Sequence, residues 1–72
     1  MLKPKVIAIW ESKGGASRVS LTRDEWGYFT YRANNAVGMV DEITAEDAIA
    51  SLAARVNDFQ PDKNKAPMHR IA

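Results

Sequence analysis

The chain has 72 residues, of which 46% are hydrophobic and 26% charged, and its formal net charge at pH 7 is +1. This length fits a single domain, and the composition is typical of a folded globular protein rather than a disordered one. Cysteine is absent, which excludes a disulfide framework and a thiolate metal site.

The first predicted strand covers residues 6–11, and its apolar residues fall on both faces. Val6, Ala8 and Trp10 share one face by their spacing of two. A strand of this kind is typically buried on both sides or lies centrally in a sheet. Residues 12–17 follow as a turn cluster that contains two adjacent glycines.

Residues 18–32 are the most informative stretch, because they form two alternating strands about one tight turn. The strands are predicted at 18–23 and 28–33, and Gly27 is expected to take the left-handed position of the turn between them. The side chains of one face, expected to point to the core, are Val19, Leu21, Phe29 and Tyr31. The side chains of the opposite face are Arg18, Ser20, Thr22, Tyr28, Thr30 and Arg32.

A turn at Asn34-Asn35, a weaker strand over residues 36–40 and a helix complete the predicted elements. The helix opens at Thr44, whose hydroxyl can accept from the Asp47 amide, and ends before Pro61. Its apolar stripe consists of Ala45, Ala48, Ile49, Leu52, Val56 and Phe59.

This order predicts an α+β fold: a three- to four-stranded antiparallel β-meander with one C-terminal α-helix packed on one face. Residues 1–60 are expected to form a single domain. Residues 61–72 are expected to form a flexible basic tail with Lys63, Lys65 and Arg70, or one that orders on contact. The helix should cover one face of the sheet and leave the Arg/Tyr/Thr face open.

The sequence contains no pattern that indicates catalysis. His69 is the only histidine and lies in the predicted tail, where a catalytic geometry is hard to hold. Neighbouring acids such as Asp41 and Glu42 diverge on a strand or helix, and the Lys13-Gly14-Gly15 segment lacks a phosphate-loop pattern. We therefore predict no enzyme, no cofactor and no metal site.

Two features have open interpretations. Trp26 lies at the hairpin tip, where it either anchors a protein contact or folds back over the helix end to close the core. The helix carries Ala50, Ala53 and Ala54 beside its apolar stripe, which is compatible with a homodimer or docking groove, or simply with high helix propensity.

Charge is unevenly distributed along the chain. Residues 1–40 carry six bases against three acids, residues 41–58 five acids against one base, and residues 59–72 three bases against one acid. Such a dipolar chain does not fit DNA mimicry, which needs a strongly acidic surface, and gives only mild support to phosphate binding.

The segment Ser17-Arg18-Val19-Ser20-Leu21-Thr22-Arg23-Asp24, with its return strand and Ala-rich helix, resembles small anti-CRISPR proteins of phages and mobile elements. The resemblance covers roughly residues 6–56 and consists of element order and size; short bacterial domains of unknown function share the same order. The first resemblance implies a non-catalytic inhibitor that binds a Cas subunit and blocks nucleic-acid or nuclease access. It transfers no functional residue.

The sequence thus predicts a non-enzymatic protein-interaction module, with an anti-CRISPR-type inhibitor as its specific form. The predicted partner-binding residues are Arg18, Arg23, Trp26, Tyr28 and Arg32. The alternative is a single-stranded nucleic-acid binder that uses the open sheet face and the basic tail. No signal peptide or membrane span is expected, so the predicted location is the cytoplasm, or the host cytosol for a phage-encoded chain.

Overall fold

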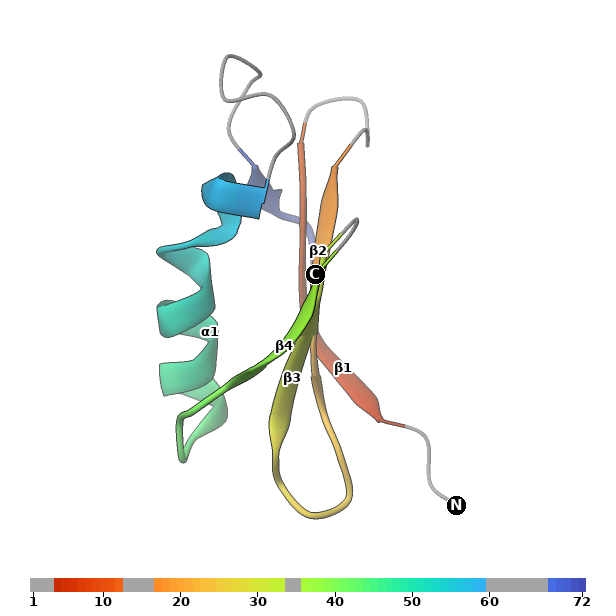
Figure 1. Cartoon of the computed structure of the whole chain (residues 1–72), viewed down its shortest axis with the longest axis vertical. Helices are drawn as coiled ribbons and strands as arrows, with labels where there is room; N and C mark the ends of the chain where they lie inside the picture. Colours follow the sequence, from red (N-terminus) through yellow and green to blue (C-terminus); the bar gives the residue numbers. More distant parts are fainter. Residues whose placement is uncertain (1–3, 13–16, 34–35, 60–67) are drawn as a thin grey trace.

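The fold is a single antiparallel sheet with one helix packed on it, as the computed structural model shows for residues 4–12, 17–33, 36–59 and 68–72 (Figure 1). The elements in chain order are β1 (Lys5–Glu11), β2 (Arg18–Arg23), β3 (Phe29–Arg32), β4 (Val37–Val40), α1 (Ala45–Ala53), the 3₁₀ helix η2 (Val56–Phe59) and β5 (His69–Arg70). The strand order is β4-β3-β2-β1-β5. The predicted α+β meander with one helix is therefore confirmed, with a short fifth strand added at the edge beside β1.

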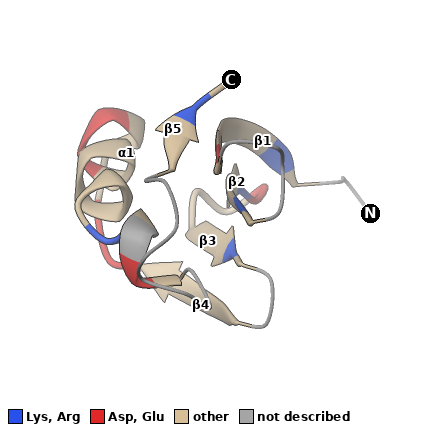
Figure 2. Ribbon diagram, turned by 90° about the horizontal axis from the view of Figure 1, so that it is seen from above, with Lys and Arg blue, Asp and Glu red and all other residues tan. Residues whose placement is uncertain are grey.

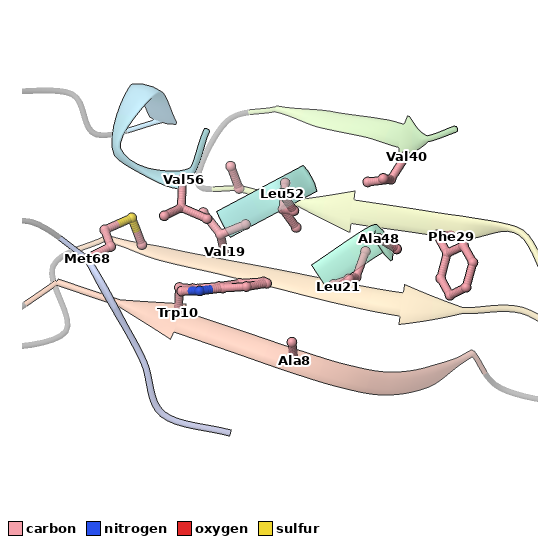
Figure 3. Packing of buried hydrophobic residues seen from close by; sticks show 11 residues of the cluster. Ala8, Trp10, Val19, Leu21, Phe29, Val40, Ala48, Leu52, Val56 and Met68 are labelled. Carbon is pink, nitrogen blue, oxygen red and sulfur yellow. The ribbon is translucent and has the colours of Figure 1, made fainter. Parts of the chain in front are cut away.

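The two faces of the β2–β3 hairpin are those expected from alternation. The register places Leu21 opposite Tyr31 and Thr22 opposite Thr30. Val19, Leu21 and Phe29 are almost fully buried beneath the helix (Figure 3). Side chains of the other parity form what we call the open face, where Arg18 and Arg32 are exposed and Ser20, Thr22 and Thr30 are partly buried.

A β-bulge in β1 changes the expected pattern of the first strand. Val6 lies opposite Thr22 and Ala8 opposite Leu21, so Ile7 is an extra residue between them. Because the bulge inverts the alternation, Val6 is on the open face and 52% exposed, whereas Ala8 and Trp10 are buried. The expectation that Val6 shares a face with Ala8 and Trp10 was wrong for this reason.

The helix begins as predicted and ends earlier than predicted. Thr44 is the N-cap, and its hydroxyl accepts from the Asp47 amide at 3.1 Å. The chain leaves the α-helix after Ala53, where the Arg55 amide bonds to the Leu52 carbonyl in a tighter turn. The apolar stripe is confirmed: Ala48, Leu52 and Val56 are buried, and Ala45, Ile49 and Phe59 pack against this core.

The end of the chain packs on the sheet through the two-residue strand β5, which corrects the expectation of a flexible tail for residues 68–72. Met68 is buried, and His69–Arg70 pairs with Glu11 and Trp10 of β1. The Ile71 amide also donates to the Ile9 carbonyl at 2.8 Å. This short strand pairs with the outer edge of β1, where backbone groups need partners. The remaining part of the expected tail, 61–67, lies outside the described residues, as does the expected turn at Asn34-Asn35.

Gly38 allows the ring of Tyr31 to lie across β4. The two residues are opposite each other in the β3–β4 register. A Cβ atom at position 38 would lie 2.6 Å from the Tyr31 hydroxyl oxygen and 2.7 Å from the Cε1 and Cζ ring atoms. The ring cannot easily retreat, since its centroid is 5.1 Å from that of Phe59 and the Arg55 guanidinium stacks over it at 5.8 Å.

We expect Gly38→Ala to lower the free energy of unfolding by about 1–3 kcal/mol, because the added methyl group displaces the Tyr31 ring. Urea unfolding followed by circular dichroism measures this. The control is the same substitution in a Tyr31→Leu background, where the cost should largely disappear. An equal cost in both backgrounds would show that the Tyr31 ring is not the obstacle.

Candidate functional site

The tip of the β2–β3 hairpin has a shape fixed by Asp24. One carboxylate oxygen, Oδ1, accepts from the backbone amides of Trp26 at 3.0 Å and Tyr28 at 2.9 Å. The Asp24 amide donates to the Tyr28 carbonyl at 3.0 Å, and the Gly27 amide to the Asp24 carbonyl at 3.1 Å. Gly27 has a φ of 87°, the left-handed conformation that its place in the turn predicts.

This geometry holds two aromatic side chains outward. Trp26 is 74% exposed and Tyr28 is 58% exposed. Of the two interpretations of Trp26, the one in which it folds back to close the core is therefore wrong. An exposed tryptophan on an ordered turn is the arrangement that a protein-contact anchor requires.

The hairpin lies beside the connection from β4 to α1, and the two enclose a groove. Phe29 pairs with Val40, so the connection that leaves β4 begins beside the base of the hairpin, at the same end of the fold (Figure 1). The resulting open groove has a volume of about 550 Å³. We call it the hairpin groove; its lining residues are Arg23, Trp26, Gly27, Tyr28, Phe29, Met39, Val40, Asp41, Glu42 and Ile43.

The hairpin groove gathers most of the large apolar surface that the described residues expose. Met39 is 62% exposed and Ile43 is 90% exposed, and both line the groove with Trp26 and Tyr28. Isolated exposed apolar residues are ordinary on protein surfaces, whereas several that line one groove make it a candidate for binding. This cluster is the strongest candidate site in the described part of the chain.

Arg23 places a positive charge within this groove. Its guanidinium lies 5.3 Å from the centroid of the Phe29 ring and also against Gly27. The contact with the ring orients the guanidinium and leaves it exposed to a partner.

The five predicted partner-binding residues divide between two surfaces. Arg23, Trp26 and Tyr28 come together at the hairpin groove. Arg32 lies on the open face, where it helps to line a shallow depression with Ser20, Thr22, Thr30 and Val37. Arg18 lies opposite Glu11, at the far end of β2 from the hairpin tip.

Sequence reasoning missed four residues of the groove: Met39, Asp41, Glu42 and Ile43. A signal was present, because Ile43 is an isolated large apolar residue between two acids and the N-cap of the helix. The position of Ile43 in the sequence does not show which part of the fold the connection after β4 lies against. The pairing of β3 with β4 places this connection beside the β2–β3 hairpin.

Other kinds of site receive no support from the described residues. In the described segments, no group of three or more His, Asp or Glu side chains is arranged to hold a metal ion. None of the helices described there is long and apolar enough to cross a membrane. Comparison of the chain with family models, with curated proteins and with solved structures finds no match.

We expect Asp24→Ala to lower the free energy of unfolding by about 1 kcal/mol, since two amides at the turn lose their side-chain acceptor. Asp24→Asn is the matched control, because its carbonyl oxygen can still accept from both amides. Urea unfolding gives the stability, and the amide chemical shifts of Trp26 and Tyr28 report the turn itself. If Asp24→Ala and Asp24→Asn changed these amide chemical shifts equally relative to the wild type, the Asp24 side chain would not act as the acceptor that orders the turn.

Proposed function

We propose that this chain is a non-enzymatic protein-binding module that recognises its partner through the hairpin groove. The observation that supports this proposal is the clustering of four exposed apolar side chains, Trp26, Tyr28, Met39 and Ile43, around one groove. Two of them are aromatic and are held on an ordered turn, so little side-chain and backbone freedom is lost when a partner binds.

The composition of the open face favours a protein partner over a nucleic acid. Its strand residues, by register, are Val6, Ile9, Glu11, Arg18, Ser20, Thr22, Thr30, Arg32, Val37, Met39 and His69. Met39 lies at the edge that the open face shares with the hairpin groove. None of these is Phe, Tyr or Trp; Tyr28, which was expected on this face, precedes β3 and lines the hairpin groove. Single-stranded nucleic-acid platforms instead stack successive bases on several aromatic rings of the sheet face. Phe29 and Tyr31, the two aromatic residues within β3, face the helix instead.

The resemblance to anti-CRISPR proteins suggests one class of partner, a subunit of a Cas effector complex. Under this proposal the chain would act by occupying a surface that the complex needs, not by chemistry on a substrate. The hairpin groove, rather than the open face with Arg18 and Arg32, is the surface that would make this contact.

The double variant Trp26→Ala/Tyr28→Ala tests the surface. Immobilised wild-type chain is exposed to lysate of the source cells, and a retained protein is identified by mass spectrometry and its affinity measured. We expect the variant to weaken this affinity by roughly 100-fold or more, as for the loss of two aromatic anchors. The variant should stay folded, because both side chains are mainly solvent-exposed.

The matched control is Arg32→Ala/Val37→Ala, which changes two neighbouring exposed residues of the open face. It should leave the affinity for the retained protein nearly unchanged. Loss of binding in this control, with retention in Trp26→Ala/Tyr28→Ala, would move the contact to the open face and overturn the proposed surface.

A labelled single-stranded oligonucleotide provides the test against the alternative function. We expect no retention by the chain even at low salt, where phosphate contacts are strongest. Binding that falls steeply as salt increases, and that Arg32→Ala weakens, would favour the nucleic-acid function instead.

A further inference from the structure

The charges around the hairpin groove indicate the chemistry of its partner. Resting on the proposed function, we infer that the groove binds a basic protein segment: an apolar side chain enters between Trp26 and Ile43, and flanking Lys or Arg side chains meet the carboxylates at the rim. The inference concerns the segment that occupies the groove and does not depend on the identity of the protein that carries it.

Acidic residues from three parts of the chain meet at this end of the molecule. Asp24 and Glu25 lie on the hairpin tip, Asp41 and Glu42 on the connection after β4, and Glu46 and Asp47 in the first turn of α1. These segments are at the same end of the fold, the lower end in Figure 1. The fold therefore joins the acids of the hairpin, which lie in an otherwise basic stretch of sequence, to the acidic stretch after residue 40.

Part of this acidity has a structural explanation. Asp24 accepts the hydrogen bonds that order the turn. Glu46 and Asp47 lie in the first turn of α1, where their negative charges stabilise the helix by interacting with the positive end of its dipole. Glu25, Asp41 and Glu42 have no such role in the described contacts, and Asp41 and Glu42 line the groove itself. These three carboxylates are the ones available to a partner.

The bases of the described residues lie mostly elsewhere. Figure 2 shows Lys and Arg on β1, β3 and β5, and Asp and Glu on α1. At the hairpin end, Arg23 lies against the Phe29 ring, with Lys5 opposite it in the register. The acids exceed the bases there, so this end should attract a basic segment, and should repel an acidic segment or a phosphate backbone.

The apolar and acidic parts of the groove have different tasks. Desolvation of Trp26, Tyr28, Met39 and Ile43 should supply most of the binding free energy, as in other anchor pockets. Carboxylates at an exposed rim should contribute less to affinity and more to the choice and orientation of the partner. A partner segment with a basic residue next to a large apolar residue can contact both the apolar lining and the carboxylates at the rim.

A random peptide library displayed on phage, selected against the immobilised full chain, tests this directly. We expect the enriched peptides to share one large apolar residue flanked by Lys or Arg, and to lose binding to Trp26→Ala/Tyr28→Ala. A synthetic peptide of the enriched sequence should bind Asp41→Asn/Glu42→Gln roughly tenfold more weakly than wild type, the effect of losing exposed ion pairs.

The control is Glu11→Gln/Asp58→Asn, which removes the same number of carboxylates at the opposite end of the fold and should leave the affinity unchanged (Figure 1). Neutral or acidic peptides that bind through Trp26 and Tyr28 would overturn the basic partner and preserve the proposed function. Basic peptides that bind regardless of Trp26→Ala/Tyr28→Ala would overturn both. A library that yields no binder would also overturn the inference, since the groove would then not recognise a linear segment.

Discussion

The register between β2 and β3 determines what each face of the sheet presents. Side chains alternate strictly along a strand, so a slip of one residue would exchange Leu21 and Phe29 for Thr22 and Thr30 beneath the helix. Two independent features hold the register. The turn is closed by Gly27 and by the Asp24 carboxylate, and the buried side chains of both strands share one core with Ala48 and Leu52 (Figure 3). The same turn projects Trp26 and Tyr28 to the solvent, so one local structure both aligns the core and builds the candidate site.

The β1 bulge allows β1 to pair with β2 although the regular alternation of its side chains would not match that of β2 along the whole strand. Alternation without a bulge would place Val6, Ala8 and Trp10 together on one face. At the other end of the β1–β2 pair, the Ser12 amide donates to the Ser17 carbonyl and Trp10 lies opposite Val19. The extra residue, Ile7, returns the start of β1 to register with Thr22 while Ala8 stays in the core. Ile7 itself packs partly against the core, so the apolar side chain that the bulge leaves exposed is that of Val6.

The parts of the structure that sequence could predict are those with local causes. Alternation gave the faces of residues 18–32, and the hydroxyl of Thr44 with the three- and four-residue spacing after it gave the helix start and its buried stripe. The parts that it could not predict depend on distant pairing. Strand β5 has only two residues and no pattern of its own, and it exists because the edge of β1 is there to pair with. The groove likewise needs Ile43 beside the hairpin, which follows from the pairing of Phe29 with Val40 and not from either segment alone.

The position of Trp26 is the strongest physical argument for a binding role. A domain of this size has little apolar surface to bury, and a large side chain moved from solvent to core would stabilise it by about 1.5–3 kcal/mol. The Trp26 side chain is close enough along the chain to reach the core, since Phe29, only a few residues away, is buried. The hydrogen bonds of Asp24 to the amides on either side of Gly27 instead fix the turn in a form that keeps the indole outside. Burial of the Trp26 side chain in the core would have stabilised the fold. Because the side chain lies at the surface beside Ile43 and Met39, the same free energy can be gained when a partner buries it.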